Sequence, residues 1–178
     1  VDGPATALFR HCVAVATAAE SIAEIIGHPS PGDCFTAGMM HDLGKLALLQ
    51  VAPETFVRVT EASETRGISL SDAEREMGAP PHAALGQRLA QRWRFPLPLE
   101  AAIAFHHEVR LESRAALPRQ AHQPVDVTTV ADAICNRSTR LAAGAVPAGL
   151  PREVLARLSV TESIEQRTVD AIQRKMER

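Results

Sequence analysis

Proline and glycine residues divide this 178-residue chain into short segments, and apolar residues recur at helical spacing within them. In the segment 5–26, for example, Leu8, Val15, Ile22 and Ile26 share one helical face. No segment alternates apolar and polar residues strongly enough to predict a strand, and the sequence contains no internal repeat or low-complexity tract. The chain is therefore predicted to be all-α, a compact helical bundle and not an up-down four-helix one.

The expected helices are bounded by proline, glycine and capping residues. Pro53 suits the first turn of one helix. Ser69 or Ser71 is expected to cap another, in which Glu74 completes a capping box with Ser71. The polar residues 110–123 are expected to form a loop. The expected helices cover residues 5–26, 34–50, 53–66, 71–77, 82–94, 98–108, 125–143, 152–159 and 162–176.

The length of the chain suits one domain with an appendage. We expect residues 1–143 to form one helical domain. Residues 144–178 are expected to form a C-terminal helical extension that packs on this domain or projects from it. The chain opens on Val1 instead of Met, from which we expect a preceding region to be missing.

The composition argues against several classes of partner. The formal net charge is -2, and aromatic residues make up 3% with no Tyr, which argues against binding to nucleic acid. The three cysteines are far apart and lack a Cys-x-x-Cys spacing, which is typical of reduced thiols in a cytoplasmic protein. No stretch reaches the ~18 consecutive apolar residues of a membrane span, so no membrane partner is expected.

The pair His41 and Asp42 lies within the apolar segment 35–51, where burial alone disfavours two polar groups. Neutral imidazole and carboxylate are ligands that hold divalent metals. Lys45 would lie one helical turn beyond His41, where its cation can hold a phosphate oxygen. The alternative is a buried, hydrogen-bonded His-Asp pair beside a solvated lysine.

Four more histidines and one more aspartate are candidates, and each also has a simpler structural explanation. A histidine on an apolar helix face is more often hydrogen-bonded in the core than a metal ligand. A histidine that begins a helix can be a capping or exposed residue, and two near a helix C-terminus complement its dipole. A buried aspartate in mid-helix needs a partner, for which an arginine such as Arg137 would serve. These candidates are His11, His82, His106, His107 and Asp132.

Taken together, these residues occur in the order His, His-Asp, His, His-His and Asp, which resembles the HD superfamily of metal-dependent phosphohydrolases. The pattern is more similar to the HDOD family, the HD-related output domains of bacterial signalling proteins. The resemblance covers roughly residues 11–141, and its most specific part is the run of Glu, Gly, His, Gly, Trp-x-x-Pro and Ile-x-x-His-His. The segments that carry it are 10–11, 37–46, 74–78, 82–86, 93–96, 102–107 and 131–132.

The resemblance implies an all-α HD fold, usually preceded in HDOD proteins by a further helical region. It implies that a first metal is bound by the residues His11, His41, Asp42 and Asp132. Positions that hold a second metal in the related HD-GYP phosphodiesterases match His82, His106 and His107. The position matching Lys45 contacts substrate phosphate, so Asp42 and Lys45 are the candidate catalytic residues.

The sequence also departs from those phosphodiesterases. After His107 and Glu108 it lacks their Gly-Tyr-Pro signature, and Ala7 stands where some of them carry a glutamate. The resemblance therefore supports neither a third metal nor hydrolysis of cyclic-di-GMP.

Three hypotheses follow. We expect a regulatory HDOD module in signal transduction, with one or two divalent transition metals (Mn, Fe, Ni or Zn) bound by the residues named above. Its partners would be a phosphate or nucleotide ligand and other signalling domains or proteins. The alternative is an active metal-dependent phosphohydrolase or phosphodiesterase on a nucleotide-like substrate, so whether the chain is an enzyme stays open. The third hypothesis is a purely structural interaction domain whose polar residues bond to one another.

Overall fold

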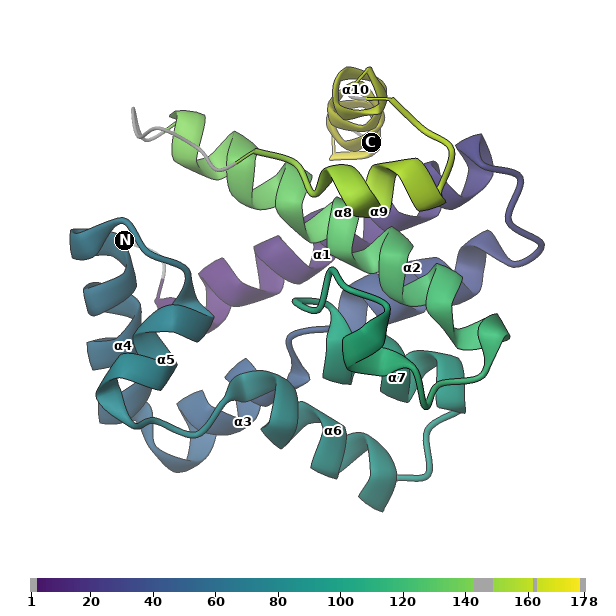
Figure 1. Cartoon of the computed structure of the whole chain (residues 1–178). Coiled ribbons are helices and arrows are strands. Elements are labelled where there is room, and N and C mark those ends of the chain that lie inside the picture. Colours follow the sequence, from purple (N-terminus) through teal and green to yellow (C-terminus); the bar gives the residue numbers. More distant parts are fainter. Residues whose placement is uncertain (1–2, 143–148, 162, 177–178) are drawn as a thin grey trace.

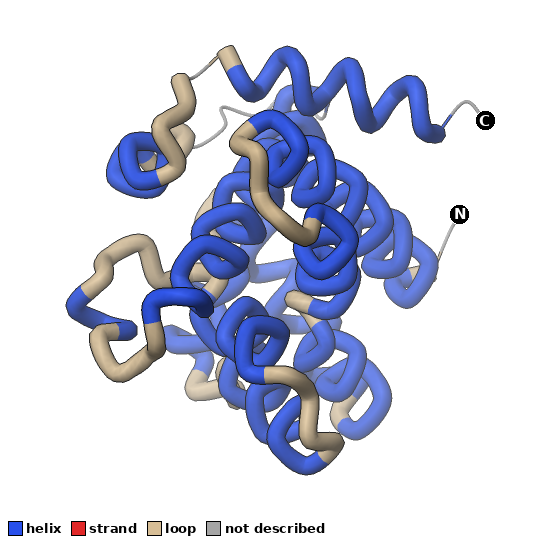
Figure 2. The backbone as a smooth tube through the Cα atoms, turned by 90° about the vertical axis from the view of Figure 1, so that its right-hand side faces the viewer, coloured by secondary structure: helices blue, strands red, loops and turns tan. Residues whose placement is uncertain are grey.

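The computed structural model describes residues 3–142, 149–161 and 163–176 of the chain. Figures 1 and 2 show these residues as helices joined by loops, and no strand occurs among them, which confirms the all-α prediction. The elements are α1 (Pro4–Ile25), α2 (Pro31–Met40), α3 (Leu43–Val51), α4 (Pro53–Arg66), α5 (Leu70–Met77), α6 (His82–Arg92), α7 (Leu97–Phe105), the short 3-10 helix η1 (Glu112–Arg114), α8 (Arg119–Ala142), α9 (Arg152–Arg157) and α10 (Ile164–Met176). None of the described helices is long and apolar enough to cross a membrane.

The main hydrophobic core lies where α1 packs against α2 and α8. Val15 and Ile22 of α1 and Ile134 of α8 are fully buried in it. Each such side chain contributes about 1.5–3 kcal/mol when it leaves water, so this core dominates the stability of the bundle. The polar residues that α1, α2 and α8 carry are therefore held on a rigid frame.

The helices α9 and α10 pack on the same core. Val154, Leu155 and Leu158, together with Ile164, are buried in the cluster that α1 and α8 form. In Figure 1 the two helices lie beside α8, on the side of the molecule away from α6. Most of the expected linker falls at residues 143–148, outside the described residues, and the division into domains at residue 144 stays a prediction.

Close contact between backbones fixes α3 against α6. A Cβ atom added to Gly44 would lie 1.8 Å from the carbonyl oxygen of His82. Gly86 of α6 faces the same contact, because a Cβ atom there would lie 3.1 Å from the backbone nitrogen of Gly44. Only glycine permits two helices to approach this closely. The contact places the beginning of α3, and with it Asp42, beside the beginning of α6.

The structure differs from the sequence prediction at residues 34–50, which form two helices instead of one. The first helix ends at Met40, and Asp42 is the N-cap of α3 with φ -96° and ψ 20°. The two helices pack on different partners, α2 on α1 and α3 on α6, so the chain changes direction between them. No proline or helix-ending glycine marks this break, because tertiary packing and not local preference produces it.

The predicted loop at residues 110–123 is also partly wrong. The residues Glu112–Arg114 form η1, and α8 begins at Arg119 rather than at residue 125. Pro124 lies within α8, where it removes a single backbone donor near the beginning of a long helix. The irregular segment between α7 and α8 is therefore short, and it carries His106 and His107 at its beginning.

Candidate metal centre

Two imidazoles and two carboxylates meet where α1, α8 and the α2–α3 junction converge. The Nε2 atom of His11 lies 3.1 Å from Asp132 Oδ1 and 3.5 Å from Asp42 Oδ2. The Nε2 atom of His41 lies 3.2 Å from Asp42 Oδ2 and 3.6 Å from Asp132 Oδ1. We call these four side chains the first group. Their separations are those of ligands around one small cation, and His11, His41 and Asp42 form a set able to hold a metal ion.

The ring of His41 is oriented by the backbone that precedes it. Its Nδ1 atom lies 2.7 Å from the carbonyl oxygen of Gly38 and donates to it, so in the neutral ring Nε2 carries the lone pair. The Nε2 atoms of His11 and His41 and the Oδ1 atom of Asp42 are buried and make no well-aligned hydrogen bond among the described residues, although nitrogen and carboxylate oxygen atoms of the two groups lie 3.1–3.6 Å apart. Buried polar atoms are rarely left without partners, and here all of them face one region. The donor set fits a divalent metal.

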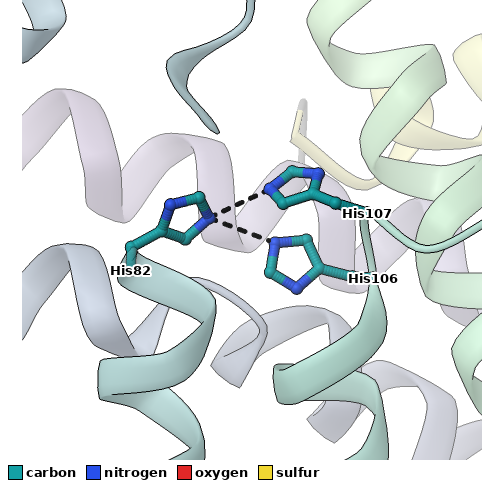
Figure 3. Close-up of side chains that lie close together, drawn as sticks. All are labelled: His82, His106 and His107. Carbon is teal, nitrogen blue, oxygen red and sulfur yellow. Dashed lines mark hydrogen bonds between the residues drawn. The ribbon is translucent and has the colours of Figure 1, made fainter. Parts of the chain in front are cut away.

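Three histidines, drawn in Figure 3, form a second group beside the first. His82 begins α6, and His106 and His107 follow α7. The Nε2 atom of His82 lies 3.0 Å from Nε2 of His107 and 3.4 Å from Nε2 of His106. His82 and His106 are buried, whereas His107 is exposed. Three imidazole nitrogens this close together also form a set able to hold a metal ion.

Asp42 joins the two groups. Its Oδ2 atom faces the histidines of the first group, and its Oδ1 atom lies 3.5 Å from Nε2 of His82 and 3.6 Å from Nε2 of His106. One carboxylate can therefore serve two ions at once, one through each oxygen. The break between α2 and α3 creates this geometry, because it leaves Asp42 at a helix terminus between both groups.

The role predicted for Glu74, completion of a capping box with Ser71, is wrong. Glu74 is 1% exposed, and its Oε1 atom lies 2.8 Å from Nδ1 of His82. The backbone N–H of His82 also donates to both of its carboxylate oxygens at 3.2 Å. Of the two predicted caps of α5, the structure has Ser69, which accepts from the N–H of Asp72, and not Ser71 with Glu74. Glu74 therefore orients His82 toward the centre. The sequence pattern that resembles the HDOD family includes Glu74, but the resemblance implied no contact between Glu74 and His82.

The partner of Asp132 is also not the predicted Arg137. Arg137 forms an ion pair with Glu165 at 2.8 Å. Asp132 instead accepts from the side-chain amide of Asn136, at 2.8 Å, on the same helix. The amide occupies one lone pair of Oδ1 and leaves the carboxylate aimed at the first group. The signal that could have identified Asn136 is its spacing of four residues from Asp132 on the same helix.

Lys45 lies in α3, and its position relative to His41 is not that of two residues on one helix. Its Nζ atom donates to Oδ2 of Asp42 at 2.6 Å, and its side chain is 14% exposed. The interpretation of a solvated lysine is therefore wrong. The expected contact between Lys45 and a phosphate stays a prediction.

The charges of the first group favour a cation at its centre. Burial alone would lower the pKa of His41, but the carboxylates of Asp42 and Asp132 raise it to about 10. Burial would raise the pKa of Asp42, but His41 and Lys45 hold it well below its usual range. The carboxylates thus stay ionised and attract either a proton on His41 or a metal ion.

The second group has the opposite character. Desolvation of the ring lowers the pKa of His106 below its usual value. Part of the His107 side chain is exposed, but its ring lies against that of His106, and desolvation there together with the neighbouring His106 lowers the pKa of His107 well below the usual value. Both rings are therefore neutral at physiological pH, which is the form of imidazole that binds metals.

Comparison with known proteins agrees with this architecture. The family model described as the HDOD domain matches residues 4–109. An uncharacterized protein of Treponema pallidum (strain Nichols) is 30% identical over 139 residues, which are 76% of this chain and 25% of that protein. The chain thus spans about a quarter of the length of this curated relative.

Two solved structures share the fold. An HDOD domain protein of unknown function from Geobacter sulfurreducens aligns with a TM-score of 0.66 and 23% identity, over 96% of this chain and 64% of that one. A protein from Marinobacter aquaeolei VT8, described as one of signal transduction, aligns with a TM-score of 0.74 and 21% identity. That alignment covers 98% of this chain and 37% of the other. At these identities the likeness concerns the fold alone.

Proposed function

This chain belongs to the HDOD family, and we propose on that premise that it is a regulatory module of signal transduction with a divalent-metal site of the HD type. The first ion would be held by His11, His41, Asp42 and Asp132. The second would be held by His82, His106 and His107, with Asp42 shared between both ions. The observation that carries the proposal is the convergence of buried Nε2 and carboxylate oxygen atoms at 3.1–3.6 Å from one another, among which the Nε2 atoms of His11 and His41 and Oδ1 of Asp42 make no well-aligned hydrogen bond among the described residues.

The nature of the ligands narrows the choice of metal. A donor set of imidazole nitrogen and carboxylate oxygen suits Mn, Fe, Ni or Zn better than Ca or Mg. Glu74 holds His82 through Nδ1, and backbone carbonyls hold His41 and His106 in the same way. Such outer partners fix the tautomer and direction of a ligand before the ion arrives. The rings are preorganised, so little side-chain entropy is lost on binding.

The absence of the Gly-Tyr-Pro signature after Glu108 favours the regulatory role over turnover, because the chain then carries no recognisable substrate clamp. The Nζ atom of Lys45 donates to Asp42, so a phosphate at the centre would share this ammonium with the carboxylate. The chemistry that bound ions would supply is electrostatic stabilisation of a phosphoryl group. We therefore propose that a phosphate or nucleotide ligand binds at the centre and that other signalling domains or proteins in the cytoplasm respond to it. The active phosphohydrolase remains the second candidate, because the ammonium of Lys45 lies beside the shared carboxylate.

The test of the metal site is elemental analysis of protein purified without chelator or affinity metal. We expect one or two transition-metal ions per chain, and at most one in His82→Ala. Asp132→Ala should lose the first ion. His28→Ala is the matched control, because His28 lies in the α1–α2 loop outside both groups, and it should keep the full content. Protein that contains no stoichiometric metal and gains none on titration would contradict the proposal.

A second assay separates the module from the enzyme. Wild-type protein supplied with Mn, Fe or Ni is mixed with bis-p-nitrophenyl phosphate, nucleoside monophosphates and cyclic dinucleotides. We expect phosphate binding that weakens in Lys45→Ala, without turnover. Metal-dependent hydrolysis that disappears in both Lys45→Ala and Asp42→Ala would establish the phosphohydrolase instead.

A further inference from the structure

Arg157 of α9 contacts the segment that carries His106 and His107. Its Nη2 atom donates to the carbonyl oxygen of Val109 at 2.8 Å. The same guanidinium binds Asp126 of α8 twice, Nε to Oδ2 at 2.9 Å and Nη2 to Oδ1 at 2.7 Å. A two-point contact with a carboxylate fixes the plane of a guanidinium, so the donor that reaches Val109 is held in place. The helix α9 is thereby bonded to the backbone two residues after His107.

Asp126 also anchors the far end of this segment. The guanidinium of Arg114, in η1, binds its Oδ1 atom, and both residues are buried. The Nε and Nη1 atoms of Arg114 are buried and have no partner among the described residues, so this charge depends on Asp126. A buried ion pair of this kind is specific in geometry and is strongly disrupted when one partner is removed. Asp126 and Arg157 thus hold the segment at two points, residues 109 and 114.

The second group is the part of the centre that needs such support. Glu74 orients His82, and the carbonyl of Ile103 orients His106. No hydrogen bond to Nδ1 of His107 is found among the described residues, and His107 is the exposed member of the group. Apart from its contacts with the other two histidines, the position of its ring is therefore set by the backbone. Two residues of chain span at most about 7 Å, so the bond at Val109 restrains His107 closely.

We propose that Arg157 is a positioning residue for the second histidine group, and that α9 thereby controls whether this group holds its ion. The inference rests on the proposed function, in which His82, His106 and His107 bind a second metal. The match to the family model ends at residue 109, whereas Arg157 lies 48 residues further along the chain. Residues outside the matched region would therefore regulate a site within it. By reciprocity, an ion in the second group must favour the docked position of α9.

The experiment is equilibrium dialysis of the full chain against buffered free Zn²⁺, which resolves the affinities of the two ions. His82→Ala identifies the second step, because it removes a ligand of that group alone. We expect Arg157→Ala to weaken the second ion roughly 10-fold and to leave the first unchanged. Arg157→Lys should not restore the affinity, because an ammonium cannot hold the two carboxylate oxygens in one plane.

Two controls separate positioning from a general loss of stability. Arg167→Ala removes an exposed arginine of α10, and Val59→Ala removes a buried side chain of α4. Neither should change the ratio of the two affinities. Equal binding of the second ion by wild type and Arg157→Ala would overturn the inference and leave the proposed function intact. Wild type that takes up no ion at the second group would contradict the proposed two-ion site itself.

A measurement on the wild type alone keeps the inference testable if Arg157 variants do not fold. Backbone hydrogen exchange of residues 154–158 is followed with the first group loaded and the second empty, and again with both loaded. We expect the second Zn²⁺ to slow exchange in α9. Exchange that is unaffected by the second ion would overturn the inference, since coupling between two sites acts in both directions.

Discussion

The two groups of the candidate centre hold similar ligands but differ in charge and in access. The first group contains two ionised carboxylates deep in the bundle, and without a metal its His41 keeps a proton, with a pKa raised to about 10 after the opposing effect of burial. The second group consists of imidazoles, and desolvation lowers the pKa of His106 and His107. The comparison teaches that the first group carries negative charge that a proton or a metal ion must balance, whereas the histidines of the second group are neutral and resist protonation. We therefore expect the first group to bind an ion tightly and the second to bind one conditionally.

The largest effect should come from Asp42, which both groups share. Asp42→Asn keeps the shape but removes the charge that faces His41, Lys45 and the second group. We expect loss of both ions by elemental analysis. In chelator, urea unfolding should show a loss of about 3–5 kcal/mol, because a buried pair loses one partner. Asp33→Asn, at an exposed position of α2, should change neither quantity. Retention of either ion would show that the groups are independent.

Moving α3 away from α6 should lower the free energy of unfolding by nearly as much. Gly44→Ala places a Cβ atom 1.8 Å from the carbonyl oxygen of His82, so α3 and α6 must move apart. We expect a loss of about 3 kcal/mol by urea unfolding, together with weaker binding of the second ion. Gly32→Ala is the matched control, because nothing lies within 4 Å of a Cβ atom there, and it should be neutral. Full stability in Gly44→Ala would mean that the helices adjust without strain.

Glu74→Gln should affect the second group alone. The substitution removes the carboxylate that accepts from both Nδ1 and the backbone N–H of His82. We expect the second ion to bind roughly 10–100-fold more weakly and the fold to lose about 1–3 kcal/mol. Glu76→Gln, on the same helix but with a half-exposed side chain, should change stability by less than about 0.5 kcal/mol. A weaker first ion in Glu74→Gln would contradict the division into two groups.

Asn136→Ala should have a smaller effect, restricted to the first group. It removes the amide that donates to Asp132 at 2.8 Å. We expect about 1 kcal/mol less stability in thermal unfolding and roughly 10-fold weaker binding of the first ion. Gln120→Ala, an exposed position of the same helix, serves as the control. Unchanged affinity for the first ion would show that the histidines alone orient Asp132.

The smallest signal is the proton that the first ion displaces. Because the pKa of His41 is raised from 6.5 to about 10, its ring is protonated at pH 8 in metal-free protein. Calorimetry in two buffers of different ionisation enthalpy should detect about one proton released with the first Zn²⁺ and none from His106 or His107 with the second.

The raised pKa of His41 also makes the stability of the metal-free protein depend on pH. The proton on His41 stabilises the metal-free fold fully below pH 6.5, and that contribution is lost as the pH rises through about 10. A first ion that binds without proton release would contradict the assigned charges.

The sequence predicted most of the helices, because proline, glycine and apolar spacing are local signals. The helix at residues 53–66 has the predicted bounds, from Pro53 in its first turn to Gly67 in the left-handed region at its end. The break at Asp42 could not be predicted, since no proline or helix-ending glycine marks the end of the first helix at Met40. Its cause lies in tertiary packing, of α2 against α1 and of α3 against α6.

The candidate ligands were found from their order, but their supporting residues were not. Glu74 fits a local capping pattern, and its actual partner His82 lies eight residues away across a turn with two prolines. That contact depends on the tertiary fold, and sequence spacing alone does not reveal it. Asn136 lies four residues after Asp132 on one helix, a spacing at which side chains interact, so its contact could have been predicted.

In the proposed centre, the shared carboxylate of Asp42 would impose an order on the loss of ligands among related proteins. A lineage that replaced any one of the three histidines of the second group would keep a working first group. A lineage that replaced Asp42 would lose both, and selection would then no longer retain the remaining ligands. Sequences with the first group alone should therefore be common, whereas sequences that keep the three histidines without Asp42 should be short-lived intermediates. The centre would lose its open half before its deep half.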